Sequence, residues 1–363
     1  MAEVWVLGGT GRTGRGVAAA LAGSGVEPVL VGRDEERLRV VAGAAGWRTL
    51  ALDGVEAMAA AVRAEAPSVV LNTVGPFTRS GPPLVDACLA TGSHYVDIAN
   101  DLAAVPAVLA RQAEAERAGC TLVTGAGFGV AATESVVSRL CDGTRRAVLV
   151  RTTMLPSLAS DGGPVGDALA GTLVEGLPGV PGGGRFAGRR VRDGRLAPAS
   201  IGGEVRELVT PDGDRVRAGL MPLGELVAAQ RASGAASVDC ASSEAPSGRA
   251  RTALRLGAGL LTVAPLRRLA ARRLATVRLP VRPAPRAHSW GHAAVTWDDG
   301  TTSEGWLRLP DAQVATTAFA AEVCRRLASG GGRPGAFTPV ALFGTELATS
   351  VGGAYVDADG STP

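Results

Sequence analysis

The chain has 363 residues, of which 46% are hydrophobic and 20% are charged, and its formal net charge is +3 at pH 7. This length allows two domains with a sizeable core, and the composition excludes a disordered or collagen-like chain. All 37 basic side chains are arginines, so the sequence excludes both a Schiff-base lysine and a tyrosine–lysine proton relay.

The first predicted element is a short, wholly apolar strand, Val4–Leu7, which glycines follow at once. Residues 8–14 read GGTGRTG and fit the G-x-G-x-x-G pattern of a dinucleotide-binding turn, with a helix after it. The start of such a helix offers free N–H groups and a positive dipole end to phosphates. The alternative is an ordinary turn in a glycine-rich chain. The predicted cofactor contacts are Gly8, Gly9, Thr10, Gly11, Arg12, Thr13 and Gly14.

The second predicted strand, Pro28–Val31, ends in Gly32, Arg33 and Asp34. NAD-selective sites place an acidic side chain at this strand end to bind the ribose 2′-hydroxyl. A guanidinium here instead pairs with a 2′-phosphate and stacks on adenine. Arg33 therefore favours NADP(H) over NAD. In the alternative interpretation, Arg33 is only a solvent-exposed neighbour of Asp34, which caps the next helix.

Strands and helices continue to alternate up to about residue 125. Further strands are predicted at 49–53, 68–72, 94–97 and 120–123, and helices at roughly 55–65, 80–91 and 102–117. This alternation predicts an α/β fold with a doubly wound parallel Rossmann sheet over residues 1–127. Ligands bind at the carboxyl ends of such strands, an edge that includes residues 97–101. We expect cofactor contacts there from Asp53, beside the adenine, and from Asn72, Thr73, Val74, Gly75, Pro76 and Phe77.

Three stretches of this region point to a family: VLNTVGPF at 70–77, GPPLVDAC at 81–88 and HYVD at 94–97. With the tail RPGAFTPVALFG at 333–344, they resemble the saccharopine dehydrogenase-like reductases, which include saccharopine reductases and trans-acting enoyl reductases. The resemblance implies a nicotinamide near Gly75 and Pro76, and last helices, in 311–363, that pack back on the Rossmann domain. The enoyl reductases usually have Gly-Phe-Asp-Ser-Pro where this chain has GFGVA from Gly127. The resemblance therefore leaves the substrate open.

A second, α+β domain is predicted over residues 128–310, for substrate binding or dimerisation. Its expected elements are a strand at 147–154, a small-residue helix at 163–176, short strands up to about 240, and a hairpin of 292–297 with 301–309. The glycine-rich stretch 177–200 is interpreted as a loop that acts as a lid. We expect the sheet of this domain to cover the nicotinamide edge and to form a homodimer.

Residues 249–286 contain ten arginines, and no acidic residue lies between Glu244 and Asp298. Residues 260–274 show a basic amphipathic pattern. The simpler interpretation is a solvated helix face. The sharper one is an anionic partner: a membrane surface bound peripherally, an acidic carrier protein, or a phosphopantetheine or CoA tail. Nucleic acid is not expected, because interleaved aromatic side chains and known binding motifs are missing.

Reduction of a C=N or C=C bond also requires a proton donor. We predict Tyr95, Asp97 and Glu134, with Asp101, His288 and His292 as weaker candidates. The alternatives are a core position for Tyr95, an N-terminal-turn carboxylate for Glu134 and a structural role for the two histidines. Five scattered cysteines and three histidines argue against a metal site. Such cysteines are typical of reduced thiols, and with no predicted signal peptide or membrane span we expect a cytoplasmic protein.

These features together predict an NADP(H)-dependent oxidoreductase. Its expected substrate is a small molecule or a carrier-linked group with a C=N bond or an activated C=C bond. The alternative is a non-catalytic NADP-binding protein that acts as a redox sensor or scaffold, since the sequence contains no obvious acid–base residue.

Overall fold

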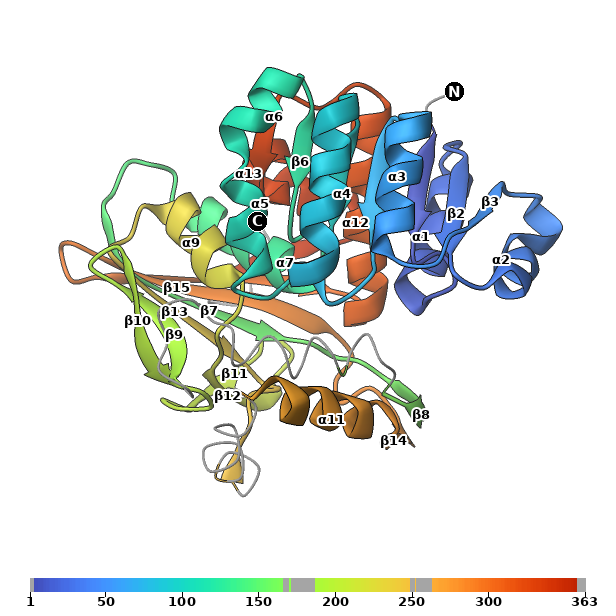
Figure 1. Cartoon of the computed structure of the whole chain (residues 1–363). Helices are drawn as coiled ribbons and strands as arrows, with labels where there is room; N and C mark the ends of the chain where they lie inside the picture. The colour runs from blue at the N-terminus through green and yellow to red at the C-terminus, as the bar shows by residue number, and fades with distance from the viewer. Residues whose placement is uncertain (1–2, 166–169, 171–186, 249–251, 253–262, 358–363) are drawn as a thin grey trace. The chain divides into compact units, whose positions relative to one another are not determined.

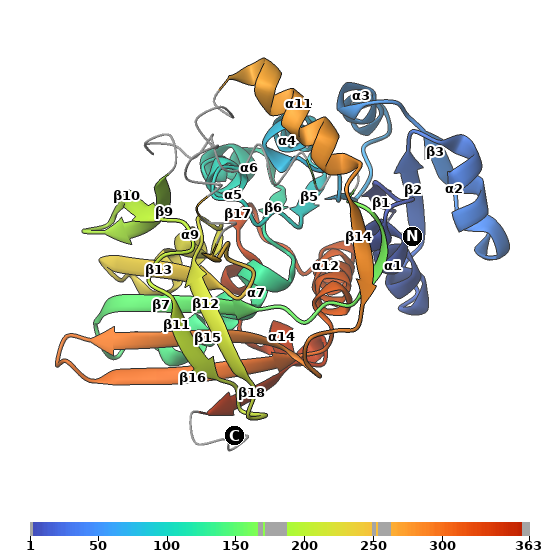
Figure 2. The same ribbon diagram turned by 90° about the horizontal axis from the view of Figure 1, so that it is seen from below.

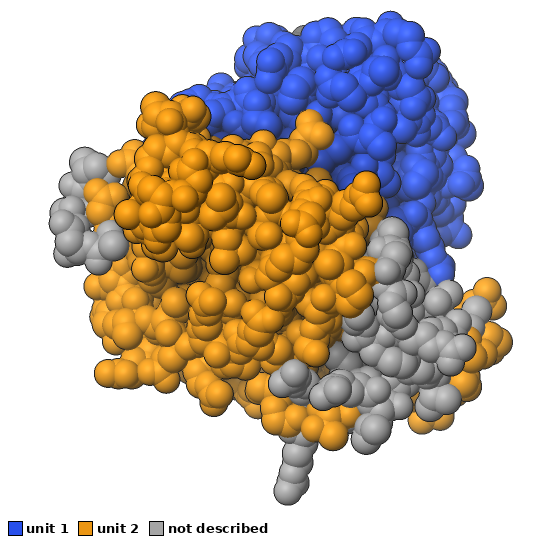
Figure 3. Space-filling view, turned by 90° about the vertical axis from the view of Figure 1, so that its left-hand side faces the viewer, with its two compact units in different colours: residues 1–99, 104–131, 313–351 blue, residues 100–103, 132–312, 352–363 orange. Residues whose placement is uncertain are grey.

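The computed structural model describes residues 3–165, 170, 187–248, 252 and 263–357. The chain forms two compact units (Figure 3). Unit 1 combines Met1–Ala99, Ala104–Ala131 and Gln313–Val351, and unit 2 combines Asn100–Ala103, Ala132–Ala312 and Gly352–Pro363.

Unit 1 contains a seven-stranded parallel sheet. Its strand order is β17 (Gly335–Phe337), β6 (Thr121–Val123), β5 (His94–Asp97), β4 (Val69–Asn72), β1 (Val4–Leu7), β2 (Pro28–Gly32) and β3 (Thr49–Ala51). Strands β1, β2 and β4 are buried along their whole length, which explains why their sequences are apolar without alternation. The order 3-2-1-4-5-6 is that of a Rossmann fold. The predicted α/β fold is therefore confirmed.

Helices cover both faces of this sheet (Figure 1). On one face lie α3 (Val55–Glu65), α4 (Phe77–Thr91) and α6 (Gln112–Ala118), and on the other α1 (Arg12–Gly23) and α12 (Ala312–Ala328). The remaining helices of the first 120 residues are α2 (Glu35–Ala42), the 3-10 turn η1 (Gly43–Ala45) and α5 (Ala104–Leu109). The single helix predicted at 102–117 is thus two short ones.

The last segment of unit 1 packs against its first. Gln313 in α12 donates a hydrogen bond from Nε2 to Thr13 Oγ1 at 2.9 Å, and a Cβ on Gly16 would lie 2.9 Å from Thr317. Strand β17 then pairs in parallel with β6, and two short helices follow, α13 (Pro339–Phe343) and α14 (Glu346–Ser350).

Unit 2 is built on a nine-stranded mixed sheet (Figure 2). The main path runs through β10 (Arg195–Ser200), β9 (Ala187–Arg192), β13 (Ser237–Ser242), β7 (Ala147–Leu155), β15 (Ser289–Trp297), β16 (Thr302–Leu309) and β18 (Ala354–Asp357). Off this path, β12 (Arg215–Leu220) pairs with β13 and with β11 (Arg206–Val209). Helices α7 (Phe128–Leu140), α9 (Glu225–Ser233) and α11 (Ala264–Ala275), and the ribbon of β8 (Ser160–Pro164) with β14 (Arg278–Arg282), complete the described part.

Two predictions for this region differ from the structure, at residues 163–164 and 187–200, whereas Ala170 inside the predicted helix is helical. Residues 163–164 end strand β8 instead of starting a helix, because Gly162 and Gly163 have φ of 77° and 97°, which no right-handed helix allows. Residues 187–200 form the hairpin β9–β10 instead of a loop. Its turn is Asp193–Gly194, with positive φ at both residues, so the sequence did contain a hairpin signal. The other residues of the predicted helix and loop, 166–169 and 171–186, lie outside the described residues.

The predicted hairpin near residue 300 is present as β15 and β16. In the part of the chain that the structure describes, no helix has the length and the apolar character needed to span a membrane.

Candidate functional site

The glycine turn after β1 leaves no room for a side chain at Gly8, Gly9 or Gly14. A Cβ on Gly14 would lie 2.4 Å from the carbonyl oxygen of Gly8, and one on Gly9 would lie 3.0 Å from Leu30. Gly8 has φ +82° and a Cβ there would meet Thr73 Oγ1 at 2.5 Å. The backbone therefore closes on itself, with Gly11 N donating to Gly8 O at 2.8 Å, and at the glycines it presents no side chain to a ligand.

Helix α1 starts directly on this turn with an open N-terminus. Its N-cap residue is Gly11, which has no side chain to cap the first turn, and no acidic residue stands in that turn. The N–H groups and the positive dipole end are therefore offered to an anion. Arg12 at the start of α1 is exposed.

A second loop, Asn72–Phe77, follows strand β4 beside β1, where the strand order reverses. Asn72 is fully buried, and its Oδ1 accepts from Val74 N at 2.9 Å while its Nδ2 donates to Ser80 Oγ at 3.0 Å. Thr73 ties the loop to β1 by donating from Oγ1 to Leu7 O at 2.7 Å. These hydrogen bonds explain why a polar residue, Asn72, ends an otherwise apolar strand: its side chain fixes the loop.

Asp97 ends β5, and its Cα is paired in register with that of Asn72. Its Oδ1 accepts three hydrogen bonds, from Ala99 N at 3.0 Å, Thr124 Oγ1 at 2.8 Å and Gly125 N at 3.0 Å. Its Oδ2 is buried and forms no hydrogen bond with the described residues. Burial raises the pKa of Asp97 to about 6, although these donors and the Tyr95 hydroxyl lower it.

Tyr95 lies two residues before Asp97 and is completely buried. Its hydroxyl accepts a hydrogen bond from Asn72 Nδ2 at 3.1 Å. Burial, and next the charge of Asp97, raise the pKa of Tyr95. The predicted sharing of one strand face thus brings Tyr95, Asp97 and Asn72 into one polar cluster within unit 1.

Comparison with known proteins identifies this domain. The family model described as the saccharopine dehydrogenase NADP binding domain matches residues 4–123. Residues 4–123 are therefore similar to this NADP-binding domain. The predicted family and the predicted cofactor, NADP(H), are both confirmed for this part of the chain.

Curated relatives of this NADP-binding domain include trans-acting enoyl reductases. The one from Mycobacterium tuberculosis (strain ATCC 25618 / H37Rv) is 38% identical over 107 residues, and the one from Mycobacterium leprae (strain TN) is 37% identical over 107 residues. Each match spans 28% of this chain and 26% of the relative, so the chain aligns with about a quarter of the length of these proteins.

A solved structure extends the likeness to the second unit. Apo saccharopine dehydrogenase (L-Glu forming) from Saccharomyces cerevisiae superposes with a TM-score of 0.61, covering 96% of both chains at 13% sequence identity. This similarity shows a shared fold over nearly the whole chain.

The edge of the NADP-binding domain beyond β2 presents charged side chains to solvent. Arg33 is exposed after β2, and within the described residues no hydrogen bond or ion pair engages its guanidinium. Asp53, after β3, is also exposed. Asp34 caps α2 by accepting from Arg37 N at 3.0 Å, which is the capping role considered from the sequence. That role leaves the Arg33 side chain unengaged.

The other predicted proton donors lie in unit 2. Glu134 is 1% exposed and sits in the middle of α7, not in its first turn. Asp101, expected on the strand edge of the NADP-binding domain, belongs with Asn100 to unit 2, where it forms a β-bridge with Leu223.

The two histidines have separate partners. His288 Nδ1 lies 2.8 Å from Asp212 Oδ2, and His292 Nε2 lies 2.7 Å from Glu304 Oε1. His292 is buried against Trp306, with ring centroids 4.2 Å apart. Among the described residues no group of three or more His, Cys, Asp or Glu side chains is arranged to hold a metal ion.

Sequence reasoning missed a buried acid in unit 2. Glu225, the first residue of α9, is 0% exposed, and burial raises its pKa to about 7. Its carboxyl oxygens lie 3.5 Å from Asn100 Nδ2 and 3.6 Å from Cys240 Sγ. The available signal was an acid followed directly by the apolar run LVAA at 226–229.

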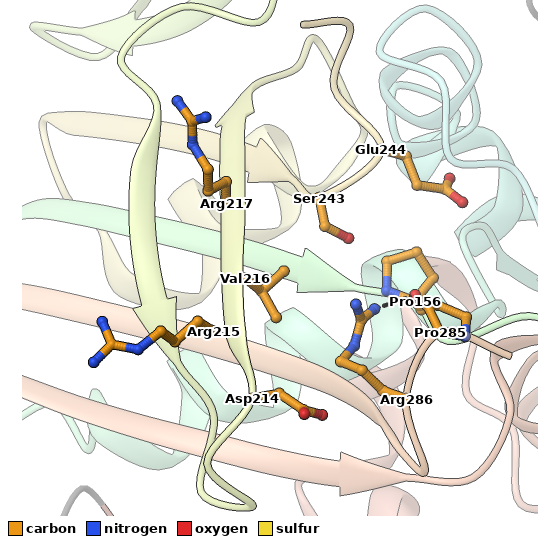
Figure 4. Close-up of a pocket in the computed structure, with 9 residues that line it drawn as sticks. All are labelled: Pro156, Asp214, Arg215, Val216, Arg217, Ser243, Glu244, Pro285 and Arg286. Atoms are coloured by element: carbon orange, nitrogen blue, oxygen red, sulfur yellow. Dashed lines mark hydrogen bonds between the residues drawn. The ribbon is translucent and has the colours of Figure 1, made fainter.

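Unit 2 also contains a polar pocket of about 380 Å³ that the sequence did not predict (Figure 4). Arg286 reaches into it, with Nη2 donating to Pro156 O at 2.5 Å and Nε buried. Asp214 and Glu244 add acidic groups, whereas Arg215 and Arg217 point away from Arg286 on the other face of their strand. Charges of both signs line this pocket, so its charge alone selects neither an anion nor a cation.

Proposed function

We propose that this chain is an NADPH-dependent reductase of a C=N bond or an activated C=C bond in a small molecule or a carrier-linked group. The observation that carries the proposal is the pair of loops at the carboxyl edge of the sheet in unit 1. One is the tight glycine turn Gly8–Gly14, and the other is the Asn72–Phe77 loop held by Asn72 and Thr73.

In this proposal the NADPH phosphates bind the turn and the N-terminus of α1, where backbone N–H groups and the helix dipole favour negative charge. Arg33 pairs with the 2′-phosphate, for which its planar guanidinium is suited. Asp53 borders the adenosine. When bound, NADPH supplies the hydride, and the protein orients the cofactor and excludes water.

Asp97 is the residue we assign to proton supply. A carboxyl group with a pKa of about 6 is partly protonated near neutral pH. Its Oδ1 is saturated by three donors, so the proton resides on Oδ2. The Tyr95 hydroxyl accepts a hydrogen bond from Asn72, and burial together with the charge of Asp97 raises its pKa. Tyr95 therefore connects this carboxyl group with the Asn72–Phe77 loop.

The reaction class rests on likeness. Curated relatives of the N-terminal domain are named trans-acting enoyl reductases, and the fold of the whole chain is shared with saccharopine dehydrogenase. These names favour reduction of C=C and C=N bonds, respectively.

The alternative is a non-catalytic NADP-binding protein. It is supported by the burial of all three predicted proton donors, since Tyr95, Asp97 and Glu134 are each no more than 1% exposed. Steady oxidation of NADPH with an enoyl thioester or an imine distinguishes the two functions. Cofactor binding without turnover on either substrate class favours the alternative.

Titration with NADPH and NADH, followed by quenching of tryptophan fluorescence, tests the cofactor assignment. Arg33→Ala is expected to weaken NADPH binding by about 10- to 100-fold and to leave NADH binding unchanged, because a charge-assisted bond contributes roughly 1.5–3 kcal/mol. Arg63→Ala, which removes another exposed arginine on α3, is the matched control. Equal effects on both nucleotides would contradict the role of Arg33.

A further inference from the structure

Exposed large apolar side chains concentrate in one part of unit 2, the segment from Val263 to Val281. Leu266 is 42% exposed, Leu269 52% and Val281 77%. The helix α11 and the strand β14 in this segment are drawn in orange in Figure 2. We call the exposed residues of this segment the basic–apolar surface. It consists of five apolar residues and five arginines: Leu266, Leu269, Val277, Leu279 and Val281, with Arg268, Arg272, Arg273, Arg278 and Arg282.

Helix α11 contributes an apolar patch with arginines around it. Leu266 and Leu269 are three residues apart, and Arg273 follows four residues after Leu269, so the three side chains share one face of the helix. Arg268 and Arg272 are also exposed and lie on the helix surface to one side of that face. This face of α11 therefore combines leucines with guanidinium groups instead of burying the leucines in the core.

Strand β14 continues the same chemistry. All five of its residues are exposed. Because side chains alternate along a strand, Leu279 and Val281 project from one side of β14 and Arg278 and Arg282 from the other. Strand β14 pairs only with β8 in the described part of the chain, and exposed apolar side chains that gather in one area mark protein or membrane interaction sites.

Acidic side chains do not balance these arginines in sequence. No Asp or Glu lies between Glu244 and Asp298, a span with ten arginines. Within the described residues, none of the arginines of the basic–apolar surface appears in an ion pair. The surface is thus strongly positive as well as apolar.

We propose that the basic–apolar surface binds the surface of an anionic lipid bilayer. Its leucines and valines enter the boundary between headgroups and acyl chains, while the arginines extend their alkyl stems over the apolar zone and place guanidinium groups at lipid phosphates. Each arginine near such a surface strengthens binding about five-fold. The attachment is peripheral.

A bilayer fits better than an acidic protein as the occupant of this surface. The apolar side chains lie on a helix and a strand, and the pocket described above is lined by other residues. A protein partner is recognised through buried anchors in matching pockets. A fluid bilayer needs no such match, since it moulds itself around separate apolar side chains.

Co-sedimentation of the full chain with vesicles tests this inference. Vesicles containing phosphatidylglycerol are expected to bind the protein at about 0.1 M salt, and the binding should weaken at least ten-fold at about 0.5 M. Vesicles of phosphatidylcholine alone should bind at least ten-fold more weakly. Equal binding to both lipids, or none to either, overturns the proposal.

Two variants locate the contact. The triple variant Arg268→Gln, Arg272→Gln and Arg273→Gln should weaken binding to phosphatidylglycerol on the order of 100-fold. The matched control changes Arg63, Arg117 and Arg195 to Gln, which removes the same charge from exposed positions elsewhere, and should have little effect. Leu266→Ser with Leu269→Ser should weaken binding at least ten-fold at unchanged net charge.

The remaining outcomes are decisive as well. Equal losses in the two arginine triples would mean that overall charge causes binding, and the surface would be rejected. Protein that stays off vesicles but binds a soluble acidic polypeptide would indicate a protein partner instead. NADPH titration and the unfolding temperature of each variant report folding, and because neither involves lipid, failure of this inference is separate from failure of the proposed reductase.

Discussion

Gly14 has no room for a side chain, because the backbone of the preceding turn lies against its Cα. The nearest atom to a Cβ would be the Gly8 carbonyl oxygen at 2.4 Å, followed by Gly8 C at 2.9 Å and Gly9 Cα at 3.0 Å. Backbone atoms cannot rotate away as a flexible side chain can. Gly23 in the same helix has no atom within 4 Å of its Cβ position and is exposed.

Gly14→Ala is therefore expected to lower the free energy of unfolding by about 2 kcal/mol or more and to weaken NADPH binding, because the turn must open to admit the methyl group. Gly23→Ala should be neutral or stabilise the chain by up to about 1 kcal/mol. Thermal unfolding and NADPH titration of both variants check this. Similar behaviour of the two would argue against a crowded turn.

Asp97 makes stability depend on pH in a definite direction. Its pKa of about 6 in the folded chain lies above the ordinary value of 3.8, so the folded state holds the proton more tightly than the unfolded one. The contribution of Asp97 to stability is complete below about pH 4 and is lost as the pH rises through 6.

Asp97→Asn removes this dependence, while its Oδ1 still accepts from Thr124, Gly125 and Ala99. The free energy of unfolding of the wild type, relative to that of the variant, should fall by on the order of 3 kcal/mol between pH 4 and pH 7. Urea unfolding at several pH values measures it, with exposed Asp53→Asn as the control. A parallel pH dependence of wild type and Asp97→Asn would show that Asp97 titrates normally.

At the scale of elements, two glycines let α7 lie close to the sheet of unit 2. A Cβ on Gly291 of β15 would lie 2.9 Å from the backbone of Ala132. A Cβ on Gly305 of β16 would lie 3.3–3.7 Å from side-chain atoms of Val136 and Leu140. The atoms that crowd Gly291 include backbone atoms, whereas those near Gly305 belong to side chains that can move.

The two glycines should therefore respond differently to substitution. Gly291→Ala is expected to destabilise the chain by about 1–3 kcal/mol, because α7 must move off the sheet. Gly305→Ala should cost less than about 1 kcal/mol, since Val136 and Leu140 can shift. Unfolding midpoints of both variants measure the difference, and a larger loss at Gly305 would contradict this packing.

Elements were predictable from sequence where local signals agreed. The apolar run Val4–Leu7 and its glycine turn gave a correct strand and helix, and Asp298–Gly300 gave a correct hairpin. The hairpin at Asp193–Gly194 has the same kind of turn sequence. It lies in a glycine-rich stretch, and this composition favoured the prediction of a loop. Strand β8 could not be predicted, because its Ser-Asp-Gly-Gly-Pro sequence is strand-like only through pairing with β14, more than 100 residues later.

For the whole molecule, the main feature is that unit 1 closes with residues from the end of the chain. Strand β17 pairs with β6, whose three residues are buried, and Thr316 Oγ1 in α12 accepts from Phe128 N at 3.2 Å. Without Gln313–Val351, strand β6 would become an open edge, and the side of α1 near Gly16 would lose its contact with Thr317.

A chain that ends at residue 312 is therefore expected to lose NADPH binding and to unfold without a cooperative transition. A chain that ends at 351 is the matched control, because it lacks β18 of unit 2 but keeps every segment of unit 1. It should bind NADPH like the full chain. Equal binding by both truncated chains would show that residues 1–131 fold without the C-terminal segment.

The sequence by itself determined the Rossmann sheet and its glycine turn, because glycine spacing and apolar runs specify backbone geometry over a few residues. Only the tertiary structure decided which groups become buried together. Burial raises the pKa of Asp97 although the donors at Thr124 and Gly125 lower it, and burial raises that of Glu225 although Asn100 and Cys240 lower it. Burial and charge interactions are set by residues distant in sequence, and a local pattern does not contain them.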